Sequence, residues 1–166
     1  MAVADEIHEH WCWRTRPPTD TGPAVVFDVD GVLSDAAGRQ HYLEAPRQNW
    51  RGFFDACGDD PLIDEVARLL ELLDPGLIIV LLTGRPVRVQ DLTLAWLARY
   101  ELRWDLLIMR DQGDYSAARS FKQRTVGELR SVGLDVRLAF EDDERNAEMF
   151  RAEGVPCIYI HSGYYE

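Results

Sequence analysis

The chain has 166 residues, of which 46% are hydrophobic and 28% charged, a composition typical of a globular domain with a single core. Its formal net charge of −11 argues against non-specific binding to nucleic acid, although a local basic pocket is compatible with it. No apolar run is long enough to span a bilayer, the start MAVADEIHEH lacks the features of a secretory leader, and three widely spaced cysteines indicate reduced thiols. These features predict a cytoplasmic protein without a membrane-spanning segment.

The chain divides into an N-terminal arm, residues 1–23, and one domain, residues 24–166. The arm is predicted to lack regular structure because prolines and a glycine interrupt it. Apolar runs rich in branched residues then predict five buried strands, at 24–29, 77–83, 105–109, 135–140 and 155–160. Helical periodicity predicts helices at 61–73, 87–100, 115–131 and 144–153. Such alternation predicts an α/β fold in which helices cover both faces of a parallel sheet.

Residues 34–60 interrupt this alternation between the first strand and the first helix. A segment of this length in a compact domain usually has a function or a structure of its own. Because it mixes aromatic residues with arginines, we predict a small flap with a short helix beside the site. An irregular insertion packed by its aromatic side chains is the alternative. Asp59 and Asp60, at its end, are candidate N-caps for the helix that follows.

Polar residues follow the predicted strands, at the edge where open parallel sheets bind ligands. Carboxylates gathered there repel one another unless a divalent cation is present, and their hard oxygen atoms suit Mg²⁺. We therefore predict a Mg²⁺ site with Asp28, Asp30 and Asp142 as ligands. The polar residues that end the four strands are Asp28 and Asp30; Thr83, Gly84 and Arg85; Arg110 and Asp111; and Glu141, Asp142 and Asp143.

Asp28 and Asp30 are two residues apart, and Gly31 allows the chain to turn sharply as it leaves the strand. A carboxylate held against a phosphoryl group can attack it and form an aspartyl-phosphate, the role predicted for Asp28. Asp30, with a pKa raised by its acidic neighbours, is predicted to protonate the leaving oxygen and then to deprotonate water. Taken alone, D-x-D-G also occurs in turns and calcium loops.

Three further positions extend the predicted site. The Thr83 hydroxyl and nearby backbone N–H groups, including that of Gly84, can receive a phosphoryl oxygen, or Thr83 caps the next helix. Lys122, the single lysine, lies in a predicted helix, where its charge either neutralises phosphate and nucleophile or faces solvent. Glu141, Asp142, Asp143 and Asn146 form an acidic run in which Asp142 is a metal ligand and Asn146 braces the loop; a plain helix N-terminus is the alternative.

The segments FDVDGVLSD, LLTGR, Lys122 and FEDDERN, in this order, resemble the four motifs of the haloacid dehalogenase (HAD) superfamily of phosphohydrolases. The resemblance implies a Rossmann-like, three-layer fold, a sheet of order 5-4-1-2-3, Mg²⁺ dependence and the roles given above. Thr83 and Lys122 are 39 residues apart, which leaves no room for a large cap domain.

The second half, with LLIMRDQGD, DVRLAFEDDERNAEMFRAEGVPC and SGYY, is similar to the phosphatase domain of phage-type polynucleotide kinase-phosphatases. This resemblance implies removal of 3′-phosphates from nucleic-acid ends and phosphate binding by Arg39 and Arg85. This sequence differs from that family at two positions that bear on the substrate. Ala118 stands where the family has an acidic residue. The paired aspartates of the family's fourth motif align with Glu141 and Asp142, so glutamate replaces the first of them. The chain has no G-x-x-x-x-G-K-[ST] loop for ATP.

We therefore predict a phosphomonoesterase with an aspartyl-phosphate intermediate, acting on a phosphorylated substrate, with a single-stranded nucleic-acid 3′ end as the leading candidate. A small-molecule or nucleotide phosphatase of the same superfamily is one alternative. A catalytically idle module that binds phosphate or a partner protein is the other. The aromatic residues of the flap either stack on bases or pack within the protein.

Overall fold

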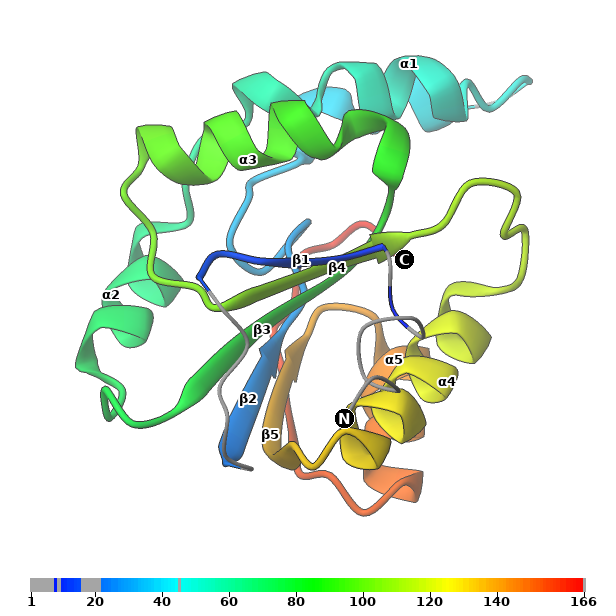
Figure 1. The fold of residues 1–166 in the computed structure, drawn as a ribbon. Helices are drawn as coiled ribbons and strands as arrows, with labels where there is room; N and C mark the ends of the chain where they lie inside the picture. The colour runs from blue at the N-terminus through cyan, green and yellow to red at the C-terminus, as the bar shows by residue number, and fades with distance from the viewer. Residues whose placement is uncertain (1–7, 9, 16–21, 45, 166) are drawn as a thin grey trace.

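The computed structural model describes residues 8, 10–15, 22–44 and 46–165, so much of the predicted arm lies outside the described residues. Six strands form one sheet in the order β1-β4-β3-β2-β5-β6 (Figure 1). Every neighbouring pair is parallel except β1 and β4, which are antiparallel. The strands are β1 (Trp11–Trp13), β2 (Pro23–Phe27), β3 (Ile78–Pro86), β4 (Leu106–Arg110), β5 (Asp135–Glu141) and β6 (Cys157–Tyr159).

Helices cover both faces of the sheet and make three layers. α2 (Asp64–Leu72) and α3 (Gln90–Arg99) pack on one face, α4 (Ala118–Ser131) and α5 (Glu144–Ala152) on the other (Figure 1). Because side chains alternate along a strand, β2 sends Val25 and Phe27 into the first core and Ala24 and Val26 into the second. This central strand is therefore buried on both sides, as its continuous apolar run predicts.

The predicted Rossmann-like fold of the HAD type is confirmed. Its five parallel strands have the expected order 5-4-1-2-3, but the sheet has a sixth strand, β1, that the prediction lacks. This strand comes from Trp11–Trp13 of the arm, whose three residues are too short for a pattern of alternation to identify. None of the helices in the described part of the chain is long and apolar enough to cross a membrane.

The flap consists of short helical turns. They are a 3₁₀ turn η1 (Ala37–Leu43), helix α1 (Trp50–Asp55) and a second 3₁₀ turn η2 (Cys57–Asp59); a third, η3 (Val87–Val89), precedes α3. α1 begins at Trp50 because the Asn49 side chain accepts a hydrogen bond from the Gly52 N–H group at 2.9 Å. The predicted short helix is thus α1, and the described residues form no large cap domain.

Candidate active site

A cavity of about 850 Å³ opens where the strands of the parallel sheet end. Its wall combines the strand ends with the flap, the start of α4 and the C-terminal tyrosines. Eight of the predicted site residues line it: Asp28, Asp30, Thr83, Gly84, Arg85, Lys122, Asp143 and Asn146. Three others, Arg39, Glu141 and Asp142, are buried and do not belong to its lining.

Lys122 joins two carboxylates of the site. Its Nζ atom donates to Oδ1 of Asp28 at 3.0 Å and to Oε2 of Glu141 at 2.8 Å. Burial alone would lower the pKa of Lys122, but the charges of Asp28 and Glu141 outweigh it and raise the pKa. Burial and Glu141 also raise the pKa of Asp28 well above its usual range, although Lys122 opposes this rise. The ammonium is therefore charged, and it compensates only part of the negative charge around it.

Asp142 completes a cluster of three carboxylates. Ligand atoms of Asp28, Glu141 and Asp142 lie within 4.8 Å of one another. Within the described ranges, both carboxylate oxygens of Asp142 are buried, and neither accepts a hydrogen bond of normal geometry. Burial raises the pKa of Asp142 to about 6, with Glu141 adding to the rise and Ser162 and Lys122 opposing it. Three buried carboxylates facing one ammonium fit a divalent cation such as Mg²⁺.

Gly31 is required by this packing. Its φ of +84° lies in the left-handed region, and a Cβ atom there would overlap the carboxylate of Asp142 and lie 3.1 Å from Cβ of Ser162. The turn after Asp30 can thus approach the loop after β5 only because residue 31 has no side chain.

Asp30 occupies a separate environment of arginines. Its Oδ1 atom accepts hydrogen bonds from Nη2 of Arg39 at 2.7 Å and from Nη2 of Arg85 at 2.6 Å. Burial raises the pKa of Asp30, but the charges of Arg85 and Arg39 outweigh it and leave this pKa below its usual value. The expected rise in the pKa of Asp30 is therefore wrong, because its nearest charged neighbours are cations.

Asp60 contacts both of these arginines. It accepts hydrogen bonds from Nε and Nη2 of Arg39 at 2.8 and 2.7 Å, and it also contacts Arg85 and the hydroxyl of Ser34. Arg39 and Arg85 are 3% and 0% exposed, so both guanidinium groups are buried against carboxylates. In this arrangement both arginines hold Asp30, and the phosphate binding that the family resemblance implies for them stays a prediction. The carboxylate of Asp30 likewise faces the arginines and is outside the three-carboxylate cluster.

The remaining predicted residues, Thr83, Asp143 and Asn146, differ in their hydrogen-bond partners. Thr83 is buried and its Oγ1 atom accepts a hydrogen bond from the Arg85 N–H group at 3.1 Å. Asp143 caps α5 through the N–H group of Arg145 and forms an ion pair with that side chain at 2.9 Å. Asn146 is buried, and its Oδ1 atom has no partner among the residues described. Asp143 therefore serves as a helix cap, the alternative given for the acidic run.

Sequence reasoning gave no site role to Asp60, which the structure places beside the site. Asp60 was a candidate helix cap, but α2 begins after Ile63 without a side-chain cap, and Asp60 instead binds the arginines. The one signal in the sequence for this network of Asp60 and arginines is the length and arginine content of the flap. Arg110 lines the cavity, as do the flap residues Gln40, Leu43, Glu44, Gln48, Trp50, Phe53 and Phe54 and the C-terminal Tyr164 and Tyr165.

Comparisons with known proteins agree with this arrangement. The family model of the polynucleotide kinase PNKP phosphatase domain matches residues 22–165. Two chains from structures of the Pnkp1/Rnl/Hen1 complex, one described as an RNA repair complex, are 28% and 29% identical to this chain, each with a TM-score of 0.73. The matches cover 90% and 87% of this chain but 45% and 47% of those chains, so it spans less than half of their length.

A more distant likeness shows the fold alone. The class C acid phosphatase from Bacillus anthracis, with tungstate bound, is 18% identical and has a TM-score of 0.59, and the match covers 89% of this chain and 69% of that chain.

The family model that matches residues 22–165 confirms the resemblance seen in the motifs. The chain is therefore a phosphatase domain of the haloacid dehalogenase superfamily and belongs to the family of polynucleotide kinase PNKP phosphatase domains.

Proposed function

We propose that the protein is a Mg²⁺-dependent phosphomonoesterase that forms an aspartyl-phosphate on Asp28 and removes 3′-phosphates from nucleic-acid ends. The observation that carries the proposal is the pairing of Asp28 with Lys122 in the wall of a cavity that also contains Asp30. A carboxylate beside one buried ammonium, with a second carboxylate two residues away, suits nucleophilic attack assisted by proton transfer.

The reaction has two steps. An oxygen of Asp28 attacks phosphorus while the bond to the leaving oxygen breaks, and Asp30 gives that oxygen a proton. A water molecule then attacks the phosphorus of the aspartyl-phosphate, its proton passes to Asp30, and Asp28 is released. Thr83 and Gly84 line the cavity, where the hydroxyl of the first and the N–H group of the second can bind phosphoryl oxygens, and Lys122 offsets negative charge.

The buried acidic cluster supports a role for Mg²⁺. Asp28 and Asp142 would hold the cation, beside Glu141, which positions Lys122. When bound, it would neutralise the cluster and polarise the phosphoryl group. The strongest support for this assignment is that the two buried oxygens of Asp142 accept no hydrogen bond of normal geometry from the described residues.

A nucleic-acid end is the substrate favoured by two observations. The chain is similar to members of a complex described as acting in RNA repair. The cavity of about 850 Å³ also has flap aromatics in its wall, and Trp50 is 49% exposed, so a base has a ring to stack on. A cytoplasmic location, compatible with the free thiols of Cys12, Cys57 and Cys157, is part of the same proposal.

The test is Mg²⁺-dependent phosphate release from a 3′-phosphorylated oligonucleotide, with a 5′-phosphorylated oligonucleotide, mononucleotides and an aryl phosphate as parallel substrates. We expect preference for the 3′ end and no turnover by Asp28→Asn, which keeps the shape of the residue. Activity on small esters alone would favour the nucleotide or small-molecule phosphatase. Absence of activity on every substrate would favour the idle module.

A further inference from the structure

Arg110, at the end of β4, lines the cavity that contains Asp28 and Asp30. Among residues 8, 10–15, 22–44 and 46–165 its side chain forms no hydrogen bond and no ion pair, and its Nε atom is buried. Burial lowers the pKa of this guanidinium, with Asp114 opposing the effect and Arg124 adding to it. A buried donor group without an acceptor is costly, so this side chain is suited to a ligand that supplies one.

The other cations of the cavity wall are already paired. Arg85 binds Asp30, Lys122 binds Asp28 and Glu141, and Arg145 binds Asp143. Within the described part of the chain, Arg110 is thus the basic side chain of this wall whose charge is not matched by a carboxylate.

The surroundings hold Arg110 beside the phosphoryl site. Its guanidinium carbon lies 5.6 Å from the centre of the Phe121 ring, an arrangement that orients the group. The position that a Cβ atom would take at Gly84 lies 3.9 Å from Nη2 of Arg110. Since Gly84 follows Thr83, the guanidinium approaches the end of β3, where phosphoryl oxygens are proposed to bind.

The start of α4 makes the same side of the cavity favourable to an anion. Ser116, Ala117 and Ala118 line the cavity, and the helix begins without a side-chain cap or an acidic residue in its first turn. Its N–H groups and dipole therefore add to the positive charge of Arg110.

We infer that Arg110 binds a phosphate oxygen of the substrate; this rests on the proposed function. The guanidinium offers several N–H donors in a fixed fork, which suits phosphate. Two groups on a 3′-phosphorylated oligonucleotide have this chemistry: the terminal phosphate that is removed and the neighbouring phosphodiester.

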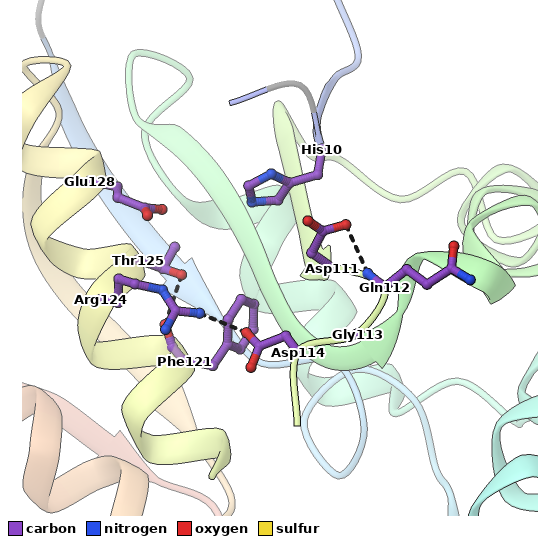
Figure 2. A pocket seen from close by; sticks show the side chains of 9 residues that line it. All are labelled: His10, Asp111, Gln112, Gly113, Asp114, Phe121, Arg124, Thr125 and Glu128. Carbon is purple, nitrogen blue, oxygen red and sulfur yellow. Dashed lines mark hydrogen bonds and ion pairs between the residues drawn. The ribbon is translucent and has the colours of Figure 1, made fainter. Parts of the chain in front are cut away.

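The test compares Arg110→Ala and Arg110→Lys with Arg124→Ala as a matched control. Arg124 lies 6.0 Å from the centre of the same Phe121 ring, but it forms an ion pair with Asp114 in a second cavity of about 370 Å³ (Figure 2). KM and kcat are measured with an aryl phosphate and with the 3′-phosphorylated oligonucleotide. Binding of inorganic phosphate is measured by calorimetry, so that a result is obtained even from an inactive protein.

For Arg110→Ala we expect a rise in KM of about tenfold or more, the range for hydrogen bonds to charged groups. Arg110→Lys, which keeps the charge without the fork, should recover part of this loss, and Arg124→Ala should resemble the wild type. A higher KM for both substrates, together with weaker binding of inorganic phosphate, assigns Arg110 to the terminal phosphate. A higher KM for the oligonucleotide alone assigns it to the phosphodiester.

An unchanged KM for both substrates, together with unchanged phosphate binding, would overturn the inference, as would an equal loss in Arg124→Ala. If the wild type hydrolyses nothing but binds phosphate more tightly than Arg110→Ala does, the proposed function fails while the binding role of Arg110 stands. If the wild type neither hydrolyses esters nor binds phosphate, both fail.

Discussion

Arg85 and Asp30 form a buried ion pair in which Nη2 of the arginine lies 2.6 Å from Oδ1 of the carboxylate. Arg39 contacts the same oxygen at 2.7 Å, and Asp60 holds both arginines. The residue proposed to transfer protons is thus kept ionised by cations. Its use as an acid must therefore depend on how strongly these two arginines lower its pKa.

Replacement of Arg39 by glutamine should move the pH dependence of the reaction. Because Arg39 is one of the two cations that lower the pKa of Asp30, Arg39→Gln should raise it, so that Asp30 keeps its proton to higher pH. With an alkyl phosphate, whose leaving oxygen needs a proton, the alkaline limb of the pH profile of kcat should then move to higher pH. Arg51→Gln is the control, since Arg51 is exposed and pairs only weakly with Asp55 at 3.9 Å. Superimposable profiles would show that protonation of Asp30 does not limit turnover.

Mg²⁺ should stabilise the folded protein through the acidic cluster. A cation that binds only the folded state at one hundred times its Kd adds about 2.7 kcal/mol to the free energy of unfolding. Asp142→Asn should abolish this gain yet stabilise the metal-free protein by roughly 1–2 kcal/mol, because it removes a buried charge that accepts no hydrogen bond of normal geometry from the described residues. Thermal unfolding in EDTA and in Mg²⁺ measures both effects. A metal-free variant less stable than the wild type would contradict the assignment.

Metal affinity should fall at acidic pH. The pKa of Asp142 is raised to about 6, so below that pH the metal must displace a proton, while above about pH 7 the carboxylate is already ionised. The dissociation constant for Mg²⁺ should therefore rise by up to about tenfold for each pH unit below 6. Calorimetric titrations between pH 5 and pH 8 test this, and a pH-independent affinity would place the cation away from Asp142.

Gly31→Ala should damage the metal site without removing any carboxylate. Gly31 and Gly113 share a φ of +84°, but a Cβ atom at Gly31 would overlap Asp142, whereas one at Gly113 has no atom within 4 Å. Gly113→Ala should cost about 1–2 kcal/mol of backbone strain, and Gly31→Ala should cost more and weaken Mg²⁺ binding. Chemical unfolding and calorimetry compare the pair. Equal behaviour of the two variants would mean that the loop after β5 can move away from the turn.

Sequence patterns sufficed for the layers of the fold and for the meeting of Asp28 and Thr83 at one edge of the sheet. Apolar runs identify the five parallel strands, although β6 at the edge is exposed at Ile158 and Tyr159 instead of buried. Parallel strands bring their carboxyl ends to one edge, so the residues that follow them meet. Lys122 reaches this edge from α4 with its ammonium 3.0 Å from Asp28. The meeting of Asp28 and Thr83 depends on strand order alone, whereas the position of Lys122 also depends on how α4 packs on the sheet.

The environment of each carboxylate could not be predicted in this way. Whether Asp30 faces acids or arginines depends on the path of the flap, which has no periodicity from which to derive it. Asp60 has the position of a helix cap in the sequence, and only the folded flap directs it to Arg39 and Arg85. The sequence predicts Arg110 at the end of a strand, but only the packed structure shows that its Nε atom is buried and has no hydrogen-bond partner among the described residues.

Strand β1 has a consequence for the behaviour of the protein in concentrated solution. Without Trp11–Trp13, β4 would form the outer edge of the sheet and would present unpaired N–H and C=O groups. An uncovered strand of this kind is a template for pairing with a second molecule. The arm thus protects the protein from edge-to-edge aggregation, and a variant that lacks residues 1–14 should form aggregates in light scattering even while its catalytic residues are all present.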